Sequence, residues 1–138
     1  MGIFDRFEDA VEKGVNSVFS KVFRSGLKPV DISSALHRVI DDQVEVPEGA
    51  AEGSNPVAPN VFVVRISGKD LATLQAEGLE AIVEDLEQGA TQYAADHNYV
   101  LAGPVSITFE EDEDESTGTL EILASVRRGA AAPAAGAA

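Results

Sequence analysis

Residues 59–105 most constrain how this chain can fold. They begin with an apolar run, residues 61–66, that is interrupted only by Arg65. A strand that is apolar at both alternating positions must be covered on more than one face. A long stretch with apolar side chains in helical phase follows, from Leu71 to Tyr93, and then a second strand begins near Val105. This order predicts a layer of helix packed on sheet, against which the rest of the chain folds.

The ends of the helical stretch carry their own local signals. Ser67 and Asp70 have the S-x-x-D spacing of a helix start. Gly78 costs about 1 kcal/mol relative to alanine inside a helix, so it is expected to divide the stretch into a short helix and a long one. Asn98 can adopt the left-handed conformation that closes a helix.

The N-terminal part predicts a pair of helices. Residues 3–24 carry apolar side chains every three or four positions, as an amphipathic helix requires. Gly26 can end this helix, and Pro29 suits the first turn of a second helix that runs to about Asp42. Residues 43–46 alternate as a short strand would.

The C-terminal part predicts a β-hairpin. Apolar and polar side chains alternate in residues 105–109 and again in residues 120–126, as in half-buried strands. Six consecutive carboxylates at residues 110–115 begin their connection, which must lie in water because burying unpaired charges is too costly.

These elements define an α+β class. We expect an N-terminal helix pair, then a strand, one or two helices and a β-hairpin, with the helices packed on a mixed three- to four-stranded sheet. Residues 1–127 form one domain with a flexible loop at 47–58, rich in glycine and small residues, and residues 128–138 form an Ala/Pro/Gly-rich linker or tail.

Charge and composition narrow the function. The net charge is −14, with 4 basic and 16 acidic side chains in residues 47–138, and such a field repels nucleic acid and anionic lipid surfaces. The chain has no cysteine, and His37 is predicted to be a surface histidine without ligand partners. The acidic connection lacks the spacing of a calcium loop. We therefore expect no enzyme activity, cofactor, metal site or direct membrane insertion, and a cytoplasmic location.

Taken together, the segments resemble the N-terminal domain of actinobacterial forkhead-associated-domain adaptor proteins of the FhaA type. The resemblance covers residues 2–127 and depends on the order and spacing of many short matches. They are Arg6-Phe7-Glu8, Phe19, Phe23, Pro29-Val30-Asp31-Ile32, Ala35-Leu36, Asp41, Pro59-Asn60, Phe62-Val63-Val64, Tyr99, Gly103-Pro104-Val105, Phe109 and Thr117-Gly118.

The resemblance implies a non-enzymatic interaction domain of a signalling adaptor. In that family a separate forkhead-associated domain, absent from these residues, reads phosphothreonine. The family's partners would be a transmembrane Ser/Thr kinase or cell-wall machinery at the inner face of the membrane. A candidate partner surface combines the apolar stripe with the basic side chains of the first helices: Phe4, Phe7, Lys21, Arg24 and Lys28.

Ser116 and Thr117 are candidate phosphorylation sites because they follow the acidic run in an exposed connection. The alternative is that Thr117-Gly118 only supplies turn chemistry. The competing function is a K-homology-like nucleic-acid module, whose order of elements is similar. The chain lacks that module's G-x-x-G loop with basic flanks, having Ala76-Glu77-Gly78-Leu79 instead.

Overall fold

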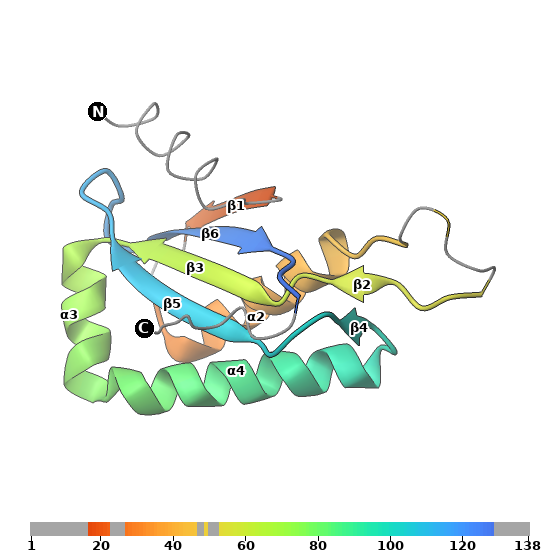
Figure 1. Cartoon of the computed structure of the whole chain (residues 1–138). Coiled ribbons are helices and arrows are strands. Elements are labelled where there is room, and N and C mark those ends of the chain that lie inside the picture. The colour runs from red at the N-terminus through yellow and green to blue at the C-terminus, as the bar shows by residue number, and fades with distance from the viewer. Residues whose placement is uncertain (1–16, 23–26, 47–48, 50–52, 129–138) are drawn as a thin grey trace.

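A four-stranded mixed sheet forms the centre of the molecule (Figure 1). The computed structural model describes residues 17–22, 27–46, 49 and 53–128, with only the backbone described for 17–22. The strands lie in the order β1 (Ser17–Val22), β6 (Thr119–Ser125), β3 (Val61–Ile66) and β5 (Ser106–Glu111). β6 pairs antiparallel with both β1 and β3, whereas β3 and β5 are parallel. The predicted α+β class with a mixed sheet is confirmed.

Three described helices accompany the sheet: α2 (Pro29–Asp42), α3 (Gly68–Glu77) and α4 (Leu79–Asp96). Helices α2 and α4 lie side by side and pack on one face of the sheet (Figure 1). Alternate β3 side chains point into this layer and are fully buried with the apolar face of α2 and with β6. The residues at the centre of this core are Phe62, Val64, Ile66, Ile32, Leu36, Val39, Ile40, Leu120 and Ile122.

The local signals at the helix ends are confirmed. The Asp70 amide donates to Ser67 Oγ (3.1 Å), which caps the start of α3. Gly78 has φ +103° and stands between α3 and α4, so it serves as the end of one helix and the start of the next. Asn98 follows α4 with φ +60°, the left-handed conformation expected there.

A second, small sheet joins β2 (Val57–Ala58) and β4 (Val100–Leu101) in parallel. Glu45 forms an isolated antiparallel bridge with Val57. The Glu45 amide donates to the Val57 carbonyl oxygen (3.0 Å), and the Val57 amide donates to the Glu45 carbonyl oxygen (2.8 Å). The strand predicted at 43–46 is therefore reduced to one bridge. The loop predicted at 47–58 ends in this short strand, β2, and its flexibility stays a prediction.

The helix predicted over residues 3–24 is wrong for residues 17–22, which form β1. The segment is rich in β-branched and aromatic residues, including Val18, Phe19 and Val22, which favour strands. Its backbone pairs with β6 over six residues, from Ser17 opposite Ala124 to Val22 opposite Thr119. This pairing gives hydrogen-bond partners to the backbone groups of β6 on the side away from β3. The spacing of apolar residues within the segment carries no information about such a partner. The remainder of the predicted helix lies outside the described residues.

The predicted hairpin is also wrong, because β3 lies between β5 and β6. The register places Arg65 of β3 opposite Glu110 on one side and Glu121 on the other. A direct hairpin would lose this alternation of charges. It would also deprive β3, which is apolar on both parities, of one of its two neighbours. Residues 112–118 instead cross over the end of β3.

Candidate functional site

The crossing between β5 and β6 presents the two predicted phosphorylation sites to solvent. Ser116 and Thr117 are both exposed, whereas Gly118 is buried. The Thr119 amide donates to the Ser116 carbonyl oxygen (2.9 Å), and Gly118 has φ +86°, as the third residue of a type II turn requires. The turn role anticipated for Thr117-Gly118 is therefore present, and it leaves both hydroxyl-bearing side chains accessible.

A buried carboxylate anchors this turn to helix α3. Asp70 is 6% exposed, and its Oδ2 accepts hydrogen bonds from the Gly118 amide (2.7 Å) and from Ser67 Oγ (3.1 Å). Ser67 Oγ in turn caps the helix by accepting from the Asp70 amide. The start of α3 and the tip of the crossing are thus one hydrogen-bonded unit.

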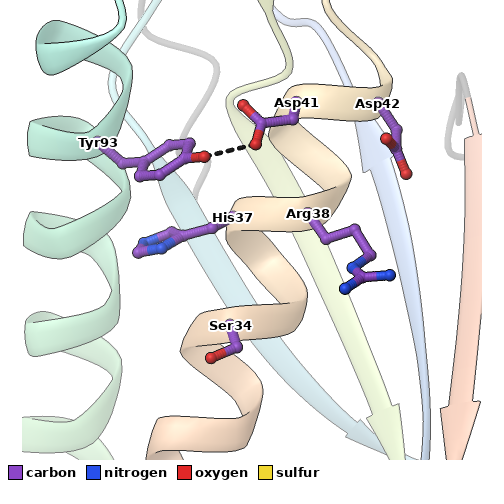
Figure 2. A pocket seen from close by; sticks show the side chains of 6 residues that line it. All are labelled: Ser34, His37, Arg38, Asp41, Asp42 and Tyr93. Atoms are coloured by element: carbon purple, nitrogen blue, oxygen red, sulfur yellow. Dashed lines mark hydrogen bonds between the residues drawn. The ribbon is translucent and has the colours of Figure 1, made fainter.

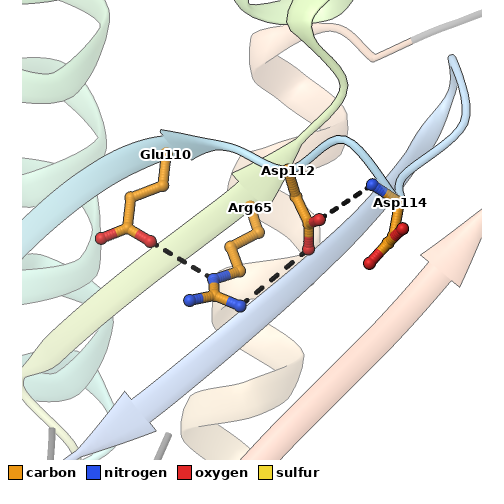
Figure 3. Close-up of polar contacts among 4 residues, drawn as sticks. All are labelled: Arg65, Glu110, Asp112 and Asp114. Carbon is orange, nitrogen blue, oxygen red and sulfur yellow. Dashed lines mark hydrogen bonds and ion pairs between the residues drawn. The ribbon is translucent and has the colours of Figure 1, made fainter. Parts of the chain in front are cut away.

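A buried guanidinium holds the other end of the crossing (Figure 3). Arg65 is 7% exposed and lies on the sheet face opposite α2; its Nε is 3.3 Å from Glu110 Oε1 and its Nη1 is 4.0 Å from Asp112 Oδ2. Asp112 Oδ1 accepts from the Asp114 amide (2.9 Å). One cation therefore organises the beginning of the acidic segment, which explains how closely spaced carboxylates are tolerated beside the sheet.

Three carboxylates of this region come close enough to be compared with a cation site. Oxygens of Asp112, Glu115 and Glu121 lie within 4.8 Å of one another. Carboxylate oxygens at such distances suit a hard cation such as Ca²⁺. Arg65, however, already places positive charge beside Asp112. One of the three carboxylates is thus already beside an arginine, and the expectation of no metal site stays a prediction.

The sequence did not predict a second cluster, which lies where α2 meets α4 (Figure 2). The ring of Tyr93 stacks on that of His37, with centroids 4.1 Å apart and planes 12° apart. His97 lies 4.1 Å from Tyr93 on a tilted plane, and Tyr99 lies 5.6 Å from His97. We call these four residues the histidine–tyrosine stack. Both tyrosine hydroxyls donate to Asp41, at 2.5 Å from Tyr93 and 2.9 Å from Tyr99.

The stack changes how its members titrate. The hydrogen bond to Asp41 raises the pKa of Tyr93 to about 12 and also raises that of Tyr99. Desolvation acts to raise the pKa of Asp41, but the two tyrosine hydrogen bonds and the nearby histidines outweigh it, so that pKa is lowered. Partial burial lowers the pKa of His37 below 6.5, against the opposing charge of Asp41. The surface histidine predicted from sequence is therefore a half-buried, stacked one.

Substituting Asp41 with asparagine is expected to lower the pKa of His37 further, because the negative charge that favours imidazolium is removed. In the unsubstituted protein, the pKa of His37 is lower in the folded than in the unfolded chain, so neutral His37 favours folding above pH 6.5. This contribution to the free energy of unfolding is lost as the pH falls through the folded pKa. Titration of the His37 ring protons by NMR measures the shift. Asp42→Asn is the matched control, an exposed neighbouring carboxylate. Equal shifts in both variants would show a general charge effect and refute the specific pairing.

The described residues include too little of the predicted partner surface to test it. Phe4, Phe7 and Arg24 lie outside the described residues, and Lys21 is described only as part of the β1 backbone. Lys28 is exposed at the start of α2, where its amide donates to Asp31 Oδ2 (3.2 Å). That surface stays a prediction.

Comparison with known proteins identifies the class to which this fold and its exposed surfaces belong. A match to a family of adaptor-type domains defines the class of this chain. The chain belongs to the family described as FhaA, N-terminal domain, whose model matches residues 4–123.

A solved structure titled "Rv0020c_Nter structure" supports the fold. It superposes with a TM-score of 0.63 at 20% sequence identity and covers 73% of each chain. The search of curated proteins finds no match. Within the described residues, every helix is too short or too polar to cross a membrane.

Proposed function

We propose that this chain is the non-enzymatic protein-interaction domain of a signalling adaptor in Ser/Thr-kinase control of cell-wall synthesis. A separate forkhead-associated domain of the full-length protein would read phosphothreonine. We place the adaptor in the cytoplasm, recruited to the inner face of the membrane by a kinase or by cell-wall machinery. Membership of the FhaA N-terminal domain family supports the adaptor role.

The observation that carries the regulatory part is the exposed turn at Ser116 and Thr117. It lies at the tip of an acidic crossing whose two ends are held by Asp70 and Arg65. Phosphate on Thr117 would add about −1.5 to −2 charge beside six carboxylates and next to the Gly118–Asp70 hydrogen bond. We infer that phosphorylation loosens the crossing, or creates a docking site for a phosphothreonine reader.

Incubation with the catalytic domain of a Ser/Thr kinase from the same host tests this role. We expect mass spectrometry to find phosphate in the peptide spanning residues 112–118, and Thr117→Ala to remove most of it. Thr91→Ala, which changes an exposed threonine in the middle of α4, is the matched control and should leave the modification intact. Unchanged phosphorylation in a chain lacking both Ser116 and Thr117 would refute the proposed site.

The nucleic-acid alternative finds less support. In a K-homology module, a G-x-x-G loop with basic flanks receives the nucleic-acid backbone. The equivalent junction between α3 and α4 is Ala76-Glu77-Gly78-Leu79, with a glutamate at its centre. Sub-micromolar binding of single-stranded RNA at low salt would overturn our choice.

A further inference from the structure

Strand β5 forms one edge of the described sheet, and its outward backbone groups can be assigned from its hydrogen bonds. The amide of Ser106 donates to the carbonyl oxygen of Asn60, and the amide of Asp112, just after β5, donates to that of Ile66, each at 2.8 Å. The backbone N–H and C=O groups of even-numbered β5 residues therefore point toward β3. Ile107 and Phe109 therefore direct their N–H and C=O groups away from β3. An edge of this kind is a template for an added strand.

A side chain of α4 already occupies one of these outward positions. Glu87 Oε2 accepts from the Ile107 amide at 3.0 Å, where the carbonyl oxygen of a neighbouring strand would otherwise lie. A hollow opens beside this contact, between the C-terminal half of α4 and the connection that leads into β5. Glu87, Thr91 and Gln92 line one side, and Leu101, Pro104 and Val105 line the other. One side of the hollow is therefore apolar, and the other side, formed by α4, is polar.

The polar side of the hollow continues along α4 as an acidic stripe. Glu80 and Glu84 are exposed and precede Glu87 and Gln88 at the three- and four-residue spacings that share one helix face. From Glu80 to Gln92 the helix rises about 18 Å. The six residues of β5 extend about 20 Å. We call the hollow, together with the neighbouring outward edge of β5, the trough. An extended segment of about six residues would be as long as β5.

The charge of this region specifies the segment that would fit. Residues 70–126 contain fourteen acidic residues and no lysine or arginine, so they account for the whole net charge of −14. Every residue of α4, β4 and β5 falls within this range. A cationic partner would be attracted electrostatically and an anionic one repelled.

We propose that the trough between α4 and the edge of β5 docks an extended, basic segment of a partner protein. Its backbone pairs with the outward groups of β5, an apolar side chain enters the hollow against Leu101 and Val105, and its cations meet Glu84 and Glu87. Glu87 is displaced from the Ile107 amide and becomes a charge partner. This inference rests on the proposed interaction role and specifies its surface.

The probe is a seven-residue peptide of alternating arginine and valine, acetylated and amidated at its ends, titrated into the ¹⁵N-labelled full chain. We expect amide shifts to concentrate in residues 84–92 and 101–111, and binding to weaken with salt. Glu84→Gln combined with Glu87→Gln should weaken binding about fivefold, because two charge pairs at the protein surface are lost. Glu113→Gln with Asp114→Asn, the same charge change in the β5–β6 crossing, should weaken it less than about twofold.

A second peptide with its central valine replaced by proline separates strand pairing from charge alone, because proline lacks a donor. It should bind several-fold more weakly. Equal binding of both peptides, or equal effects of the two charge variants, would overturn the docking site. The proposed function would remain, since phosphorylation at Ser116 and Thr117 is measured independently. Loss of that phosphorylation with a trough that still binds the peptide would instead refute the regulatory role alone.

Discussion

Substituting Asn60 with alanine is expected to lower the free energy of unfolding by about 3 kcal/mol. Asn60 is fully buried immediately before β3. Its Nδ2 donates to the carbonyl oxygens of Pro104 and Arg127, each at 3.0 Å, and its Oδ1 accepts from the Arg127 amide at 2.8 Å. Alanine removes all three bonds and leaves a small cavity, so partly buried backbone groups lose their partner.

The substitution should disturb the backbone mainly at the point where β3, β5 and β6 are joined. Asn60 ties the start of β3 to the residues before β5 and to those after β6, so it fixes the relative register of all three strands. Urea unfolding followed by circular dichroism measures the loss, and hydrogen exchange at the Arg127 amide should accelerate. Asn55→Ala, an exposed asparagine, is the control and should change stability by less than about 0.5 kcal/mol. A loss below about 1 kcal/mol for Asn60→Ala would contradict this role.

The sequence predicted the elements whose causes are local. The bounds of α2 follow from Pro29 and its apolar spacing, and the division at Gly78 follows from the left-handed conformation that glycine adopts readily. The caps at Ser67 and Asn98 depend on side chains within a few residues of the helix end. Each of these features could be recognised in a short window.

The sequence did not predict which strands are neighbours. The six residues of β1 carry apolar residues at positions that also fit a helix, and only pairing with β6, about 100 residues away, decides between the two. The insertion of β3 between β5 and β6 places Arg65 opposite Glu110 on one side and Glu121 on the other, an arrangement that becomes visible only when the strands pair. Such contacts are set by tertiary packing, which periodicity within a segment does not describe.

The candidate sites divide in the same way. The exposure of Ser116 and Thr117 followed from a run of carboxylates that cannot be buried. The histidine–tyrosine stack escaped prediction because His37 and Tyr93 are far apart in the chain and meet only when α2 packs on α4. Asp41 and Tyr99 were matched as family-like positions, and the structure adds the hydrogen bond between them.

Substituting Asp70 with alanine is expected to cost about 2 kcal/mol and to release the β5–β6 crossing. The change removes the acceptor of the Gly118 amide, which is buried, and the partner of Ser67 Oγ. Ser67→Ala, which removes the cap and the hydroxyl donor to Asp70 Oδ2 but leaves the Gly118 bond, should cost about 1 kcal/mol. Asp70→Asn keeps a carbonyl acceptor for Gly118 but loses the negative charge at the helix start, so an intermediate loss is expected.

The rate of Thr117 phosphorylation in these variants distinguishes release of the turn from loss of the α3 cap. A kinase binds its acceptor residue in an accessible segment, and the type II turn at Thr117 is held closed by the Gly118–Asp70 hydrogen bond. Asp70→Ala should therefore accelerate both hydrogen exchange at Gly118 and phosphorylation of Thr117, whereas Ser67→Ala should do so much less because the Gly118 bond survives. Equal rates in the two variants would mean that loss of the helix cap, and not release of the turn, governs access to Thr117. A faster rate in Asp70→Ala alone would identify Asp70 as the residue that couples the fold to its proposed phosphorylation.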